Sequence, residues 1–300
     1  MIARKGKLAH PALAVSLNLP LLIPSFTSKG FSYEMRGERR QYEVAGDVSD
    51  FPSRAAESIL VSAYDLHFQH LDLERVDKSV QTADNALKAA EIVVLDSGGY
   101  ELDSHMDSCE PRTALHSPPD ARFTEQDYRK IVGGLAADPK MPPLCIASFD
   151  HGYKGKSVEE QIASAKGLFV DYPNSISSFI LKPATPTDQY VNIAALSPKQ
   201  MSSMRSFNVI GATADELGKD LKTRLQQIAR LRTALNEQGI DAPIHVWGGL
   251  DPVVTPLYCF AGAELFDGVS WLRYAFQNGV AVNRKSIQVL SPKVTRPTIR

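Results

Sequence analysis

Eight short apolar runs constrain the fold of this chain more than any other feature of its sequence. Each run has an apolar core and is too short for a buried helix, which is typical of parallel strands that are covered on both faces. Polar or helical stretches separate one run from the next. The runs cover residues 20–26, 58–66, 91–99, 142–150, 175–184, 207–212, 243–251 and 264–271.

The stretches between the runs show helical periodicity. Residues 76–90 carry a stripe of small and apolar side chains, and residues 217–239 carry a longer stripe that Gly239 is expected to end as a C-cap. The longer stripe consists of Leu217, Leu221, Leu225, Ile228, Leu231 and Leu235.

Alternating strands and helices predict an α/β fold, and eight such units predict a (β/α)8 TIM barrel. An open doubly wound sheet is the alternative, but no GxGxxG follows the first run, which disfavours its dinucleotide-binding form. We expect a single domain over residues 1–300, with a leading segment at about 1–19 and a basic tail at about 280–300. Residues 27–57 and 101–123 are long, polar and turn-rich, and we interpret them as loop insertions of the kind that carry binding sites in barrels.

Charge gives only a local argument for a polyanionic partner. The chain of 300 residues has a net charge of -1, so there is no global electrostatic case for nucleic acid. From residue 274 to the end, however, five basic residues occur with no acidic one. Such a tail either contacts phosphates or is simply solvated.

Cysteine usage and hydropathy indicate a reducing, cytoplasmic setting. Cys109, Cys145 and Cys259 are widely spaced and form no CxxC, so neither a disulfide framework nor a metal knuckle is expected. No apolar stretch approaches the length of a membrane span, and no membrane association is expected. Pro11 and Pro20 interrupt the apolar N-terminal segment, and no small-residue cleavage site follows, which disfavours a signal peptide.

Three acidic residues lie at the ends of three different runs. Asp96 ends the third run, Asp150 the fourth, and Asp267 lies in the eighth. In a barrel these strand ends converge on one face, where active sites lie. Any one such acid has an ordinary alternative role as a helix N-cap or a partner of an arginine. All three together, among otherwise apolar strand ends, favour a site.

The residues that follow Asp96 are consistent with a bound planar group. Gly98 and Gly99 allow a sharp turn and a close approach of the backbone, and Tyr100 offers a flat aromatic face. The alternative is an ordinary turn after a strand, with Tyr100 in the core. Ser97 lies between the acid and the glycines and is included in the candidate site.

A second glycine pair follows the seventh run. Gly248 and Gly249 precede Asp251, which we expect as a helix N-cap, and Pro252, which we expect at the first helical position. Barrels often bind phosphate near this point, and a well-capped helix without a ligand is the alternative.

Two further side chains are weaker candidates. Arg273 is placed to pair with an acid near the eighth run or with a substrate phosphate. His245 begins a buried run and is expected to be a core histidine whose hydrogen bonds are satisfied.

The motifs together resemble one known superfamily over most of the chain. The segment LDSGGYE resembles the DSGG-aromatic motif of the tRNA-guanine transglycosylases, and ASFDH resembles their fourth-strand acid segment. The segment HVWGGLDPVVTPLYCFAGAELFDGVSWLRYAF is similar to the last two barrel units, especially in archaeal-type and DNA-modifying members. LVSAYDLHF and NVIGATADELG also resemble those members.

The resemblance implies a base exchange in a polynucleotide. It would make Asp267 the nucleophile that attacks the anomeric carbon, Asp96 the general acid and base, and Asp150 the acid that recognises the edge of guanine. Tyr100 would stack on the base, and the backbone of Gly211 would contact it. A free 7-deazaguanine, of the 7-cyano-7-deazaguanine type, would be the co-substrate.

Departures from the tRNA enzymes favour the DNA 7-deazaguanine transglycosylase branch. After Asp267 there is neither cysteine nor histidine, so no structural zinc and no zinc subdomain are expected. Glu101 stands where tRNA-type members have glutamine. We therefore expect DNA as the substrate and helper proteins of a modification system as possible partners. The alternatives are a tRNA-guanine transglycosylase without zinc, an N-glycosidase in which water resolves the intermediate, and a non-catalytic partner subunit.

Overall fold

The computed structural model describes most of the chain, with gaps in its loops and at both ends. The described residues are 4–10, 13, 16–29, 31, 33–36, 39–42, 44, 57–71, 87–102, 123–151, 153, 155–277 and 280–283. For residues 34, 36, 39–41, 272–277 and 280–283 only the backbone is described.

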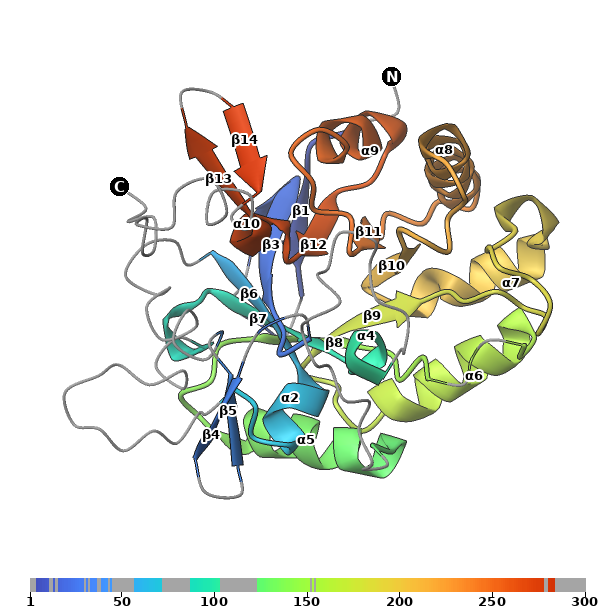
Figure 1. Cartoon of the computed structure of the whole chain (residues 1–300). Helices are drawn as coiled ribbons and strands as arrows, with labels where there is room; N and C mark the ends of the chain where they lie inside the picture. Colours follow the sequence, from blue (N-terminus) through green and yellow to red (C-terminus); the bar gives the residue numbers. More distant parts are fainter. Residues whose placement is uncertain are drawn as a thin grey trace.

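Eight parallel strands form a closed barrel, which confirms the predicted (β/α)8 fold (Figure 1). Each of the eight apolar runs supplies one strand. Around the barrel the neighbours follow chain order, and the last strand pairs with the first, as Asp267 opposite Ile23 shows. The strands are β3 (Leu21–Phe26), β6 (Ser58–Ser62), β7 (Ile92–Asp96), β8 (Leu144–Ala147), β9 (Ile176–Ile180), β10 (Val209–Thr213), β11 (Ile244–Trp247) and β12 (Leu265–Gly268).

Helices cover the outside of the barrel between β7 and β12 (Figure 1). Capping boxes begin three of them, at Thr124, Ser157 and Ser197, because a hydroxyl there accepts from a backbone N–H that would otherwise lack a partner. The covering helices are α5 (Glu125–Ala137), α6 (Val158–Phe169), α7 (Pro198–Ser203), α8 (Leu221–Glu237) and α9 (Thr255–Ala261), with 3-10 turns η2 (Ile193–Ala195) and η3 (Met204–Ser206).

The predicted helix over residues 217–239 starts later than its apolar stripe. Asp220 caps α8 by accepting from the N–H of Thr223, so Leu217 lies outside the helix although it is buried. At the other end Gly239 has a φ of 61°, and the N–H of Ile240 donates to the carbonyl of Leu235. Gly239 therefore ends the helix as predicted. Of the helix predicted over 76–90, only residues 87–90 are described, and 87–89 are helical.

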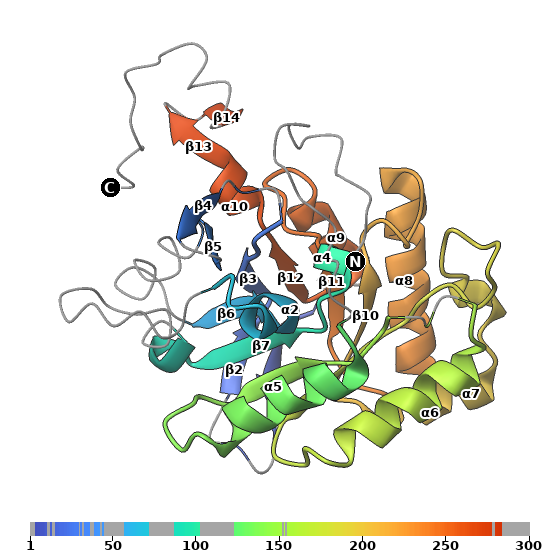
Figure 2. The same ribbon diagram turned by 60° about the horizontal axis from the view of Figure 1, so that its bottom comes forward.

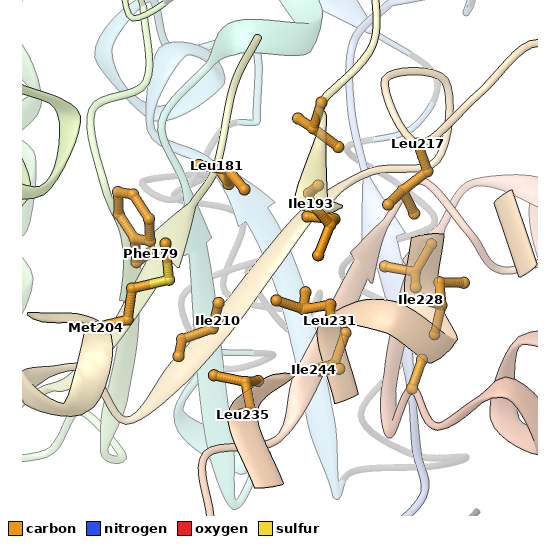
Figure 3. Close-up of a cluster of buried hydrophobic side chains, with 14 of the residues drawn as sticks. Phe179, Leu181, Ile193, Met204, Ile210, Leu217, Ile228, Leu231, Leu235 and Ile244 are labelled. Carbon is orange, nitrogen blue, oxygen red and sulfur yellow. The ribbon is translucent and has the colours of Figure 1, made fainter. Parts of the chain in front are cut away.

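The stripe of α8 packs on the outer face of the sheet. Figure 3 shows Ile228, Leu231 and Leu235 of this helix beside Ile210 of β10 and Ile244 of β11. These side chains are almost completely buried. This layer fixes the outward residues of the strands, so the alternate residues must point into the barrel.

An antiparallel hairpin from the leading segment closes the amino end of the barrel. β1 (Gly6–Ala9) pairs with β2 (Ser16–Leu19), and Leu8, Leu17 and Leu19 are buried against the inward side chains. Those inward residues include Ile92, Ile176, Val209 and Leu265, which open their strands. The amino end of the barrel is thus filled with apolar side chains.

The opposite, carboxyl end carries the short helices and two further hairpins. α2 (Ala63–His67), α4 (Gly99–Leu102) and α10 (Ser270–Arg273) follow β6, β7 and β12 directly. The predicted insertion at 27–57 contains the hairpin of β4 (Tyr33–Arg36) and β5 (Arg39–Tyr42).

Figure 2 shows the second hairpin, β13 (Tyr274–Gln277) with β14 (Val280–Asn283), standing away from the covering helices. Residues 103–122 of the other predicted insertion and residues 284–300 of the basic tail lie outside the described part. Among the described helices, none combines the length and the hydropathy needed to span a bilayer.

Candidate active site

The structure brings the three predicted acids together at the carboxyl end of the barrel. Asp96 is the last residue of β7, Asp267 lies in β12, and Asp150 lies three residues beyond the end of β8. Burial raises the pKa of Asp96 to about 7, and the negative charges of Asp150 and Asp267 act in the same direction. Because carboxylates influence one another strongly only at short range, the three belong to one site.

Asp150 is held as an anion by a buried cation. Its Oδ2 lies 2.9 Å from Nζ of Lys182, and its Oδ1 accepts a hydrogen bond from the hydroxyl of Ser97. Burial alone would raise the pKa of Asp150. Electrostatic interactions with Lys182 and His151, together with these hydrogen bonds, outweigh the effect of burial and hold the pKa of Asp150 below its ordinary value. Ser97 therefore orients an acid, which is a more specific role than the sequence indicated.

Asp267 is oriented by donors from two neighbouring strands. The hydroxyl of Ser25 donates to Oδ2 at 3.0 Å, and the backbone N–H of Gly248 donates to Oδ1 at 2.9 Å. Gly248 has a φ of 70°, a conformation that favours glycine, and this turn aims its N–H at the carboxylate. Gly248 thus supports Asp267 directly.

His245 lies below this carboxylate inside the barrel. Its Nε2 is 3.0 Å from Oδ1 of Asp267, although the angle does not suit a hydrogen bond, and its ring stacks on Trp247 with centroids 4.1 Å apart. His245 is fully buried, as predicted, but neither ring nitrogen has a hydrogen-bond partner among the described residues, so the prediction of a satisfied core histidine was wrong in this respect. A Cβ at Gly211 would lie 2.1 Å from the carbonyl oxygen of His245, so strand packing alone requires the glycine there.

The two glycines after Asp96 have different structural roles. Gly98 has a φ of 89° and donates its N–H to Oδ2 of Asp96 at 3.0 Å, and a Cβ there would meet Tyr64 at 2.7 Å. Gly99 has no such constraint. A Cβ on Gly99 would lie 3.7 Å from both carboxylate oxygens of Asp150. The absence of a side chain at Gly99 therefore leaves space in front of the acid.

Tyr100 already has one charged neighbour. The ammonium of Lys29 lies 4.2 Å from the centre of the Tyr100 ring and donates to its backbone carbonyl at 2.7 Å. The side chain of Lys29 is buried. One face of the predicted stacking residue is thus in contact with a cation.

Glu101 was not included among the candidate site residues, although its position is conspicuous. It is 1% exposed and accepts hydrogen bonds from the hydroxyls of Thr27 and Ser62. Burial, followed by the charges of Asp65 and Asp96, raises the pKa of Glu101 to about 8. At neutral pH this side chain is therefore mostly a neutral acid.

Lys182 was also missed, and it has the larger effect on the site. It occurs in the run FILKPA, where a single lysine reads as the end of a strand. Its ammonium bridges Asp150 and Glu216 at 2.9 Å each, and these two charges outweigh burial and raise its pKa. The only sequence signal was a lysine within an apolar run.

The prediction for Asp251 and Pro252 was wrong in detail. α9 begins at Thr255 with Pro256 in its first turn, and residues 252–254 form turns ahead of it. Asp251 caps those turns instead, because its Oδ1 accepts from the N–H groups of Val253 and Val254.

The remaining candidates contribute less. A Cβ on Gly249 would meet Val246 at 2.6 Å, so this glycine is needed for packing. Arg273 ends α10, and its side chain lies outside the described part. Over the described ranges, no group of three or more His, Cys, Asp or Glu side chains is arranged to hold a metal ion.

The comparisons with known proteins leave the chain unassigned. No protein-family model matches it, and no curated protein sequence is significantly similar to it. The chemistry must therefore be argued from the arrangement itself. The site combines an acid that titrates near neutral pH, an acid held as an anion, and a carboxylate fixed by two donors.

Proposed function

We propose that the chain is a base-exchange transglycosylase that replaces guanine in a polynucleotide with a 7-deazaguanine. The observation that carries the proposal is the different environment of each of the three acids. A raised pKa at Asp96 suits proton transfer near pH 7, a charged Asp150 suits an acceptor of N–H groups, and a firmly oriented Asp267 suits a nucleophile.

The proposed reaction has two displacements. Asp267 attacks the anomeric carbon, the bond from that carbon to N9 of guanine breaks, and Asp96 gives a proton to the leaving base. The incoming base then returns a proton to Asp96, and its N9 attacks the anomeric carbon as the bond to Asp267 breaks. Two inversions retain the configuration, as in glycoside hydrolysis through a covalent intermediate.

DNA is the polynucleotide that the sequence motifs favour, and a base in a duplex must first be flipped out of the stack. A tRNA substrate is the second candidate within the same chemistry. The motif resemblance supports DNA, and binding to either polymer should weaken with salt because phosphates are involved.

The direct test is a release assay with labelled guanine. Purified protein would be incubated with DNA or with tRNA carrying labelled guanine, each with and without 7-cyano-7-deazaguanine. We expect release from DNA only when the free base is present. Asp267→Asn should abolish release, whereas Asp171→Asn, a matched change at an exposed acid far from the site, should not alter it.

The other outcomes discriminate between the alternatives. Release from tRNA alone would replace DNA by tRNA as the substrate, and release without added base would indicate an N-glycosidase. No release from either polymer, with no covalent adduct on denaturing gels, would contradict the proposed function.

A further inference from the structure

The side chain of Lys182 offers more than a counter-charge for Asp150. A lysine ammonium has three N–H donors, and two of them are directed to Asp150 and Glu216. No other acceptor for this ammonium occurs among the described residues. One N–H therefore remains beside the carboxylate, on a side chain that is 15% exposed.

The hydrogen-bonding capacity of Asp150 can be counted in the same way. An ionised carboxylate has about four acceptor positions. Ser97 uses one on Oδ1, and Lys182 uses one on Oδ2. Two positions remain, one on each oxygen, and Gly99 places no side chain against them, whereas a Cβ there would lie 3.7 Å from both oxygens.

The edge of guanine presents two donors and then one acceptor, in the order N2–H, N1–H, O6. The pair of Asp150 and Lys182 presents two acceptors and then one donor, because the ammonium of Lys182 contacts Oδ2 whereas Ser97 contacts Oδ1. The two patterns match in one orientation, with N2–H on Oδ1, N1–H on Oδ2 and O6 on the ammonium. Adenine has a donor at position 6 and an acceptor at N1, so it mismatches at both.

We propose that Lys182 is a specificity-determining residue that donates a hydrogen bond to O6 of the guanine-type base held by Asp150. This inference rests on the proposed function for the class of base. Beyond that function, it assigns a role to Lys182, gives the bound base one orientation and explains a preference for a 6-oxo group. Glu216 then serves to hold the ammonium in place.

The test compares two free bases that differ only at position 6. Guanine and 6-thioguanine share N1–H and N2–H, but sulfur accepts hydrogen bonds weakly. We expect the wild-type protein to bind guanine about tenfold more tightly than 6-thioguanine, as measured by calorimetry or competition at pH 7. Lys182→Met should abolish this preference, so that the two bases bind with about equal affinity.

Two further variants separate recognition from support. Lys182→Gln keeps a neutral donor and should retain part of the preference, whereas Lys199→Met, at an exposed lysine on α7, should behave as wild type. If Lys182 only keeps Asp150 charged, Lys182→Met will weaken both bases equally and leave the ratio unchanged. That result would overturn the inference while leaving the proposed function intact.

Failure of the proposed function itself would have a different outcome. In that case neither base binds the wild-type protein, and Asp150→Asn changes nothing. Binding of guanine that is lost in Asp150→Asn, together with a ratio that depends on Lys182, supports both levels of the argument.

Discussion

Replacing Glu101 by glutamine should stabilise the protein, and more so as the pH rises. The side chain is buried between two hydroxyl donors and near two other acids, so its ionised form is disfavoured in the folded state. A group whose folded pKa is raised binds its proton more tightly in the folded state than in the unfolded state. Its contribution is fully present below the unfolded pKa and is lost as the pH rises through the folded pKa.

The size of the effect follows from the two pKa values. The pKa of Glu101 rises from 4.5 to about 8 on folding, and each unit is worth about 1.4 kcal/mol. Relative to the fully protonated state, ionisation of the unfolded chain therefore costs about 1 kcal/mol of stability at pH 5 and about 3 kcal/mol at pH 7. Glutamine cannot ionise, so its advantage over glutamate should grow by about 2–3 kcal/mol between these pH values.

Urea denaturation of the wild type and of Glu101→Gln at pH 5, 6 and 7 measures this difference. The control is Glu237→Gln, which removes a glutamate exposed to solvent at the end of α8 and should follow the wild-type profile. A stability difference between Glu101→Gln and wild type that stays constant from pH 5 to 7 would refute the reasoning. It would mean that Glu101 is ionised in the folded protein.

Four further expectations concern the site and the packing beneath it. Gly99→Ala should fold normally, because its Cβ makes only ordinary contacts, but it should weaken guanine binding by about tenfold or more. Unaltered guanine affinity in this variant would contradict the expectation. Gly98→Ala should instead lower the free energy of unfolding by about 1–3 kcal/mol, because the φ of Gly98 is positive. Single-turnover release of guanine should fall above about pH 7 as Asp96 loses its proton, and a profile that is flat to pH 9 would exclude Asp96 as the acid. Gly211→Ala should destabilise the fold by about 3 kcal/mol or more, because its Cβ would collide with the carbonyl of His245, and an unchanged melting temperature would count against this packing argument.

The sequence was sufficient for the barrel because nearly all residues of its strands are buried; Leu22 of β3, which is 57% exposed, is an exception. Runs such as 91–99 and 207–212 are apolar at both alternating positions, and in short segments this pattern is typical of buried parallel strands. The boundaries were harder, since a local hydrogen bond decides where a helix starts. Leu217 continues the stripe of α8, but the capping of Thr223 by Asp220 begins the helix four residues later.

The site was predictable only where a residue carries its own signal. An acid at the end of an apolar run, such as Asp96, is costly unless it has a function or a partner, so it attracts attention. Lys182 carries no such signal, because its meaning depends on Asp150 and Glu216, which follow two other strands. Likewise Glu101 accepts hydrogen bonds from Thr27 and Ser62, which no local pattern associates with it.

The closure of the barrel has a consequence for synthesis of the chain. β3 can complete its pairing only with β12, and Arg4 contacts Glu264, which lies 260 positions away. At about 5–20 residues per second, a ribosome needs about 12–48 s to make the residues between Phe26, which ends β3, and Leu265, which begins β12. During that time the inward side chains of β3 and the hairpin beneath them have no barrel to enter. The nascent amino-terminal part should therefore be a preferred client of chaperones, and it should become independent of them only when the last strand leaves the exit tunnel.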